Sequence, residues 1–146
     1  MTKSSLTLAD IHKVRDECLC LAAQRAARLL ARRFDKVFQP LGLTNGQFSL
    51  MVALSGTWAP RMKDLAQFLV MDPTTLTAAV KALEKRGWVT LQADAADARA
   101  RRPVLTPSGR QVVVQALPLW HSEHAKVQAG LTQNAADLSL ILKELG

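Results

Sequence analysis

Residues 72 to 106 constrain the fold of this chain more than any other segment. Asp72 is a natural helix N-cap and Pro73 a natural first helical residue, and Gly87 supplies a C-terminal stop. Apolar side chains recur between them at the spacing of one buried helix face: Leu76, Val80 and Leu83. From Trp88 the period changes, and WVTLQAD and ARRPVLT indicate two short strands joined by a turn. A capped helix followed at once by a hairpin is therefore predicted.

Two shorter helices are predicted before this segment. Thr44 and Gln47 form a capping-box signature that opens a helix ending near Gly56. RMKDLAQFL, residues 61–69, indicates the next helix, with three apolar side chains expected to face inward: Leu65, Phe68 and Leu69. The order of helix, tight turn, helix and hairpin predicts a winged helix-turn-helix lobe, so the fold class is mainly α with a small β-hairpin wing. Pro103 implies that the second strand lies at an edge.

Longer helices are expected at both ends of the chain. Residues 8–38 contain no proline or glycine and predict one long helix with two apolar stripes, which indicates burial against a second chain. A helix is predicted over about 107–129, and a final short helix has apolar side chains expected in the core: Leu131, Leu138 and Leu142. At 146 residues, the length predicts a single domain.

The charge of the chain favours a polyanionic partner. Lysine and arginine number 19 against 12 acidic residues, which gives a net charge of +7 and a pI near 10.0. The excess lies inside segments predicted to fold, so nucleic acid is favoured over an anionic membrane surface, with a merely solvated basic face as the alternative. No apolar run is long enough to span a bilayer and MTKSSLTLADIHK lacks a signal-peptide core, so a cytoplasmic protein is expected.

The face of the 73–85 helix opposite its apolar stripe carries small hydroxyl side chains and lysine. Threonine can bond phosphates or base edges and its methyl group can contact thymine, so this face suits the DNA major groove. An ordinary polar first turn is the alternative interpretation. The hairpin that follows carries Arg99, Arg101 and Arg102, and arginine suits the negative potential of a narrow minor groove.

Three stretches of the chain resemble the MarR family of bacterial transcriptional regulators. They are LGLTNGQFSLMVAL, DLAQFLVMDPTTLTAAVKALEKRGWV and DARARRPVLTPSGR, the last of which fits the family's wing motif. The resemblance covers roughly residues 30 to 131. It implies a single MarR-like domain over 1–146, with dimerisation helices at 8–38 and 107–146 and a DNA-binding lobe at about 44–106. It also implies a two-fold homodimer on a palindromic operator in double-stranded DNA.

The same resemblance implies roles for individual residues. Five residues of the fourth predicted helix would face the major groove: Thr74, Thr75, Thr77, Ala78 and Lys81. Arg99 would enter the minor groove with Asp97 orienting it, and Arg101 and Arg102 would contact phosphates. Many relatives carry arginine where this chain has Ala78, which removes one bidentate contact to guanine.

Family members typically repress until a small molecule or an oxidant changes the spacing of the two DNA-binding heads. Cys20 falls where the family's hydroperoxide sensors place their reactive cysteine, although this chain has no tyrosines around it. A cleft for a small aromatic or amphipathic ligand could be lined by Phe48, Met51 and Trp58, each of which also suits a core. His121 and His124 are spaced so that both could bind one metal ion, but they lack the pattern of a closed zinc site. Neither a metal nor a cofactor is therefore predicted.

Other functional classes fit the sequence less well. No nucleophile elbow, phosphate-binding glycine loop or carboxylate pair is present, so an enzyme is not expected. A basic dimeric protein-interaction module and a non-specific DNA binder are the alternatives to a sequence-specific repressor. Two basic wings beside two recognition helices favour duplex DNA.

Overall fold

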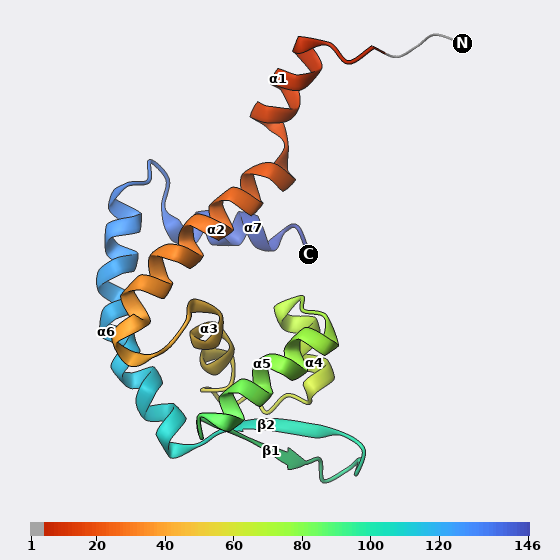
Figure 1. Ribbon diagram of the computed structural model, residues 1–146, viewed down its shortest axis with the longest axis vertical. Coiled ribbons are helices and arrows are strands. Elements are labelled where there is room, and N and C mark those ends of the chain that lie inside the picture. The colour runs from red at the N-terminus through yellow and green to blue at the C-terminus, as the bar shows by residue number, and fades with distance from the viewer. Residues whose placement is uncertain (1–4) are drawn as a thin grey trace. The chain divides into compact units, whose positions relative to one another are not determined.

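The computed structural model describes residues 5–146 and contains eight helical segments and one hairpin in that range (Figure 1). In chain order they are α1 (Leu8–Glu17), α2 (Leu19–Phe38), the 3-10 turn η1 (Gln39–Leu41), α3 (Asn45–Ala53), α4 (Met62–Leu69), α5 (Pro73–Lys85), β1 (Val89–Ala93), β2 (Arg101–Leu105), α6 (Pro107–Ala129) and α7 (Ala135–Lys143). This order confirms the predicted mainly helical fold with a two-stranded wing.

The chain divides into two units, one ending at Arg33 and the other running from Phe34 to Gly146. In the first unit, the prediction of one helix over residues 8–38 is wrong. Cys18 has extended backbone angles, φ −71° and ψ 113°, and separates α1 from α2. All side chains of α1 are exposed, so packing within its unit does not hold it in line with α2. The break lacks the proline or glycine that would have marked it. The single-domain organisation stays a prediction.

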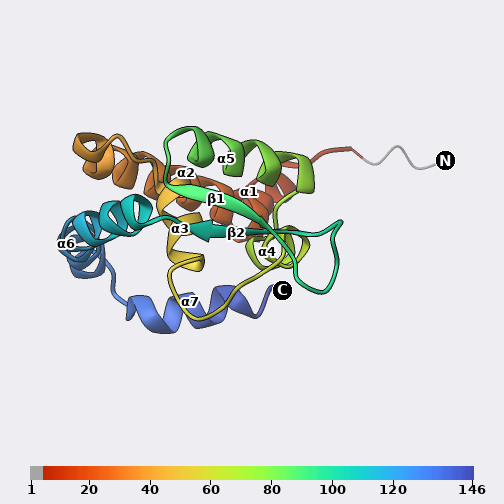
Figure 2. The same ribbon diagram turned by 90° about the horizontal axis from the view of Figure 1, so that it is seen from below.

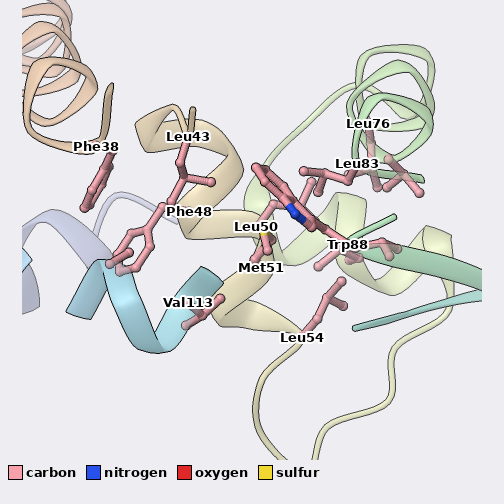
Figure 3. Packing of buried hydrophobic residues seen from close by; sticks show 14 of the residues in the cluster. Phe38, Leu43, Phe48, Leu50, Met51, Leu54, Leu76, Leu83, Trp88 and Val113 are labelled. Carbon is pink, nitrogen blue, oxygen red and sulfur yellow. The ribbon is translucent and has the colours of Figure 1, made fainter. Parts of the chain in front are cut away.

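The core of the second unit lies among α3, α5, α6 and the start of the hairpin (Figure 3). Met51 of α3, Leu76 and Leu83 of α5 and Trp88 before β1 gather around it. Phe38, at the end of α2, packs against Phe48 with ring centroids 4.7 Å apart. The buried stripe predicted for α5 is therefore confirmed, because Leu76, Val80 and Leu83 are each at most 1% exposed.

Some side chains predicted to lie in the core are exposed. Phe68 is 64% exposed, and its ring meets Trp58 edge-on instead of entering the core. Leu131, Leu138 and Leu142 at the C-terminal end are each at least 38% exposed. Helical spacing shows which residues share a face, but only the tertiary arrangement decides which face a neighbouring element covers.

The wing is a two-stranded antiparallel hairpin with Val89 paired to Leu105 and Leu91 paired to Pro103. Each strand is an edge strand, so Pro103 fits without disturbing a central ladder, as predicted. Along the hairpin, α5 contacts β1 and α4 contacts β2. Figure 2 shows α5 lying along β1, with the loop at the tip of the wing extending beyond α4.

Hydrogen bonds join the start of α6 to Gly87 and Trp88, which follow α5. The Thr106 hydroxyl donates to the carbonyl oxygen of Gly87 at 2.6 Å and accepts from the N–H of Gly109 at 3.0 Å. The Thr106 N–H donates to the Trp88 carbonyl at 3.0 Å. A Cβ on Gly109 would lie 2.1 Å from that same carbonyl oxygen, so only glycine fits here. The Leu-Thr-x-x-Gly end of the wing motif thus joins α6 to the segment between α5 and β1.

Residues 5–146 include no helix that combines the length and the apolar character needed to cross a membrane.

Candidate nucleic-acid interface

The inner face of α5 packs into the core, and its outer face is exposed. Asp72 caps the helix, accepting from the N–H groups of Thr74 at 3.0 Å and Thr75 at 3.2 Å. The five residues predicted to face the major groove are all exposed: Thr74, Thr75, Thr77, Ala78 and Lys81. The structure therefore brings them together on one accessible helix face.

The threonine hydroxyls on α5 are not equivalent. Thr77 donates its hydroxyl hydrogen to the carbonyl oxygen of Pro73 at 2.8 Å, so its hydroxyl keeps only its acceptor capacity for another partner. Across residues 5–146, the hydroxyls of Thr74 and Thr75 have no hydrogen-bond partner. These two hydroxyls can both donate and accept, whereas Thr77 can act outward mainly as an acceptor and an apolar contact.

Arg99 and Arg101 are both exposed on the wing. Asp97 was expected to orient the Arg99 side chain, but its carboxylate accepts from the Arg99 backbone N–H at 3.0 Å. Arg101 donates to the carbonyl oxygen of Ala98 at 3.1 Å. Asp97 therefore shapes the turn that carries Arg99, and the Arg99 guanidinium extends from that turn with no intramolecular partner among residues 5–146.

Arg102 does not have the free surface position expected of a phosphate contact. Its Nε donates to the carboxylate of Asp94, and its Nη1 donates to the carbonyl oxygen of Ala59. Arg61 donates to the other oxygen of the same carboxylate at 2.9 Å. The side chain of Asp94 is only 2% exposed, whereas that of Arg102 is 33% exposed. Arg102 thus forms an ion pair inside the lobe, and a contact between Arg102 and phosphate stays a prediction.

Asp94 is a residue that the sequence pattern did not single out. Its carboxylate also accepts from the backbone N–H groups of Ala96 at 3.1 Å and Asp97 at 2.9 Å. Burial by itself would raise the pKa of Asp94, but the hydrogen bond from Arg102 and those two backbone donors outweigh burial and hold the pKa below its ordinary value. The carboxylate is therefore ionised at neutral pH. In the sequence, the only sign of this role is that Asp94 lies three residues before Asp97, where the wing motif begins.

A hollow between α5 and β1 adds two residues to the candidate interface. It is lined in part by Lys81 and Lys85 of α5 and by Thr90 of β1. Lys85 follows Lys81 by one helical turn, so the two ammonium groups lie on the same side of α5. All three side chains are exposed, and this hollow, which Glu84 also lines, continues the outer face of α5 toward the wing.

The residues considered for a signal lie in different environments. Cys20 is exposed and Cys18 is half-buried, and both are free thiols. Phe48 and Met51 lie in the core, whereas Trp58 is 43% exposed, and a ligand cleft lined by these three side chains stays a prediction. His124 stacks on Trp120 with centroids 4.5 Å apart. Within residues 5–146, His, Cys, Asp and Glu nowhere gather in a group of three that could hold a metal ion.

Comparisons with known proteins agree with this geometry. The MarR family model matches residues 43–100. The transcriptional regulator MosR of Mycobacterium tuberculosis, in complex with DNA, is 35% identical with a TM-score of 0.80, over 88% of this chain and 93% of MosR. The HTH-type regulator YwoH of Bacillus subtilis is 30% identical over 82 residues, which are 56% of this chain and 59% of YwoH.

A third similar protein is BpsR of Bordetella bronchiseptica, whose DNA binding is regulated by 6-hydroxynicotinic acid. It is 26% identical with a TM-score of 0.73, over 88% of this chain and 91% of BpsR. Together with these comparisons, the capped helix with an exposed polar face beside a basic hairpin places the chain among winged-helix transcriptional regulators. Within that class, the chain belongs to the MarR family.

Proposed function

We propose that this protein is a homodimeric, sequence-specific regulator that binds a palindromic operator in double-stranded DNA and represses transcription until a signal releases it. The observation that carries the proposal is the exposed polar face of α5 beside an ordered wing that presents Arg99 and Arg101. A helix of this kind fits the major groove while the wing reaches the adjacent minor groove.

Each exposed group has a specific role in this proposal. Thr74 and Thr75 donate to phosphates or base edges, and Lys81 contacts a base or a phosphate. Ala78 and the methyl group of Thr77 supply apolar contact with thymine methyl groups, since neither donates outward. Arg99 enters the minor groove. The contacts with phosphates set the salt dependence of binding, and those with base edges set the sequence preference.

Dimerisation is supported by exposed apolar side chains in each unit. On α7, Leu140, Ile141 and Leu142 are each more than half exposed. In the N-terminal unit, Leu19 and Leu29 of α2 are 68% and 60% exposed. Surfaces this apolar are typical of chains that associate. A two-fold dimer would present two copies of α5 and two wings to two half-sites, which matches a palindrome.

Two kinds of signal are compatible with release. A small aromatic or amphipathic ligand is supported by the similarity to BpsR, whose DNA binding responds to 6-hydroxynicotinic acid. An oxidant is supported by the exposure of Cys20, since oxidation of a thiol requires access. Loss of operator binding after mild hydroperoxide in wild type, but not in Cys20→Ser, would assign the oxidant route.

Fluorescence anisotropy of the purified protein tests the proposal. Labelled duplex from immediately upstream of its own gene is compared with scrambled duplex over a salt series. A preference of about 10³-fold or more for the upstream duplex is expected of a specific regulator. Equal weak affinity would instead indicate a non-specific DNA binder, and no binding at low salt would indicate a protein-interaction module.

The substitution Arg99→Ala tests the role of the wing in operator binding. Loss of one groove contact should weaken operator binding by about 1–3 kcal/mol. Folding is expected to be unaffected, because the Arg99 side chain has no partner among residues 5–146. Unchanged affinity in this variant would contradict the role given to the wing.

A further inference from the structure

We propose that Asp94 is a positioning residue for DNA binding: it ties the tip of the wing to the N-terminal end of α4 and thereby fixes where Arg99 is presented. This inference rests on the proposed function, since it concerns how the wing is prepared for DNA. It also assigns Arg61 and Arg102 to the same positioning, because both bind the Asp94 carboxylate.

The Asp94 carboxylate joins three parts of the lobe. Arg61, the N-cap residue of α4, and Arg102, in β2, each bind one of its oxygens, and the backbone of the wing turn binds it through two N–H groups. Arg102 extends the connection to the carbonyl oxygen of Ala59, in the segment before α4. The partners Arg61 and Asp94 are 33 residues apart in the chain. One buried carboxylate thus crosslinks the wing to the helix-turn-helix.

A tie of this kind is needed at the tip of the wing. At the base of the hairpin, Val89 is buried and Leu91 and Leu105 pack against the core, but this packing does not reach the tip. Residues 95–99 at its tip are all exposed, so no apolar packing holds them. Polar contacts must therefore order the segment that carries Arg99.

A continuous set of hydrogen bonds leads from Asp94 to Arg99. The Asp94 carboxylate accepts from the Asp97 N–H at 2.9 Å, and the Asp97 carboxylate accepts from the Arg99 N–H at 3.0 Å. The Asp97 carbonyl oxygen also accepts from the Ala100 N–H at 3.0 Å, and the Asp94 N–H donates to the Ala100 carbonyl oxygen at 3.1 Å. The backbone of Arg99 is thereby placed before DNA arrives, which lowers the ordering cost of binding.

Asp94→Asn provides a test in which two explanations predict opposite signs. If Asp94 acted only through its charge, removing a negative charge would tighten binding to DNA. If it positions the wing, the amide loses the ion pairs with Arg61 and Arg102, and operator binding should weaken by about tenfold, within the range for loss of a groove contact. Glu17→Gln on α1 is the charge-matched control, because Glu17 is exposed and pairs with Lys13 of its own helix, outside the Asp94 network. It should not weaken binding.

A double-mutant cycle with Arg99→Ala distinguishes positioning from general destabilisation. If Asp94 acts through Arg99, Asp94→Asn should change affinity by less than about twofold in the Arg99→Ala background. Minor-groove protection at the wing position in a hydroxyl-radical footprint should fade in Asp94→Asn, while protection by α5 persists. A merely structural role for Asp94 would instead weaken binding equally in both backgrounds and reduce all protections together.

Two results would overturn the inference: operator affinity in Asp94→Asn equal to or tighter than wild type, or full additivity with Arg99→Ala. If Asp94→Asn does not fold, Arg61→Gln removes only the outer arm of the network, since the Arg61 side chain is 37% exposed. The same two readouts then apply to Arg61→Gln. Failure of the proposed function is separate, because in that case wild type itself shows no preference for operator duplex.

Discussion

Val70 has a backbone conformation that its side chain disfavours. It lies in the left-handed region, with φ 52° and ψ 45°, at the end of α4. The tight turn into α5 requires this geometry, because the Met71 N–H must reach back to the Ala66 carbonyl oxygen at 2.9 Å. A β-branched residue here costs about 1–2 kcal/mol. Its side chain is 89% exposed, so little burial offsets the cost.

Val70→Gly is therefore expected to stabilise the protein. Relief of the left-handed strain exceeds the added entropy of glycine in the unfolded chain, so a net gain of about 0.5–1 kcal/mol is expected. Urea or thermal unfolding measures it. Val70→Ala is the matched control, since it shortens the side chain but keeps a Cβ and should gain less. A loss of stability in Val70→Gly would contradict the strain.

At Gly109, in contrast, the native residue is the one that the position requires, because there is no room for a Cβ. Gly109→Ala would place a Cβ 2.1 Å from the Trp88 carbonyl oxygen, so α6 or the start of β1 would have to move. We expect a loss of about 2–3 kcal/mol in the free energy of unfolding, as for overpacking of a filled site. Gly46→Ala is the control, because no atom lies within 4 Å of its new Cβ, and it should be neutral or stabilising. Equal effects of the two substitutions would refute the steric argument.

The sequence identified single residues well when their role depended on near neighbours. Asp72 and Thr44 cap their helices as predicted, because a cap bonds N–H groups two or three residues away. Phe68 was wrongly placed in the core, and the ion pair of Arg102 was missed, because both depend on residues distant in the chain. The guanidinium of Arg102 finds a buried carboxylate, and the ring of Phe68 lies on an uncovered face of α4.

The ion pairs of Asp94 connect β2 with α4, and they make the stability of the folded protein depend on pH. The pKa of Asp94 in the folded protein lies below its ordinary value of 3.8. The ionised form is therefore favoured by folding, and its contribution to stability is complete above pH 3.8 and is lost as the pH falls from 3.8 through the folded pKa. The groups that face the Asp94 carboxylate are the guanidinium groups of Arg61 and Arg102 and the backbone N–H groups of Ala96 and Asp97.

Melting temperature as a function of pH, compared between wild type and Asp94→Asn, checks this dependence. The difference between the two proteins should be constant near neutral pH and shrink only below about 3.8, because the asparagine variant has no proton to gain at this site. A difference that disappears already near pH 6 would mean that another titrating group is responsible.

At the level of elements, sequence patterns located α3 to α6 and both strands, since caps, apolar period and proline positions all act locally. The boundary at Cys18 was missed, because an extended residue between two helices there has no local marker. The contacts of α4 with β2 and of α5 with β1 also follow from packing, not from any pattern in either element.

At the scale of the whole molecule, the apolar face of α7 leads to a prediction about association. Ile141 is 59% exposed in this chain, and we expect a second copy to cover it. Ile141→Asp should shift the protein toward monomer, because a charge buried at an apolar interface is costly, and should weaken operator binding by loss of the second half-site. Light scattering after size-exclusion chromatography reports the mass. An unchanged dimer would place the interface elsewhere.

By itself, the sequence determined helices α3 to α6, the hairpin and the outward face of α5, because these depend on periodicity and on contacts within a few residues. Only the tertiary structure decided that Asp94 is buried, that Arg102 serves it, and that Phe68 remains exposed. These outcomes involve partners such as Arg61 and Asp94, 33 residues apart, or Arg102 and Ala59, 43 residues apart. Such pairs form only when packing of the core brings their elements together, and no local pattern encodes that choice.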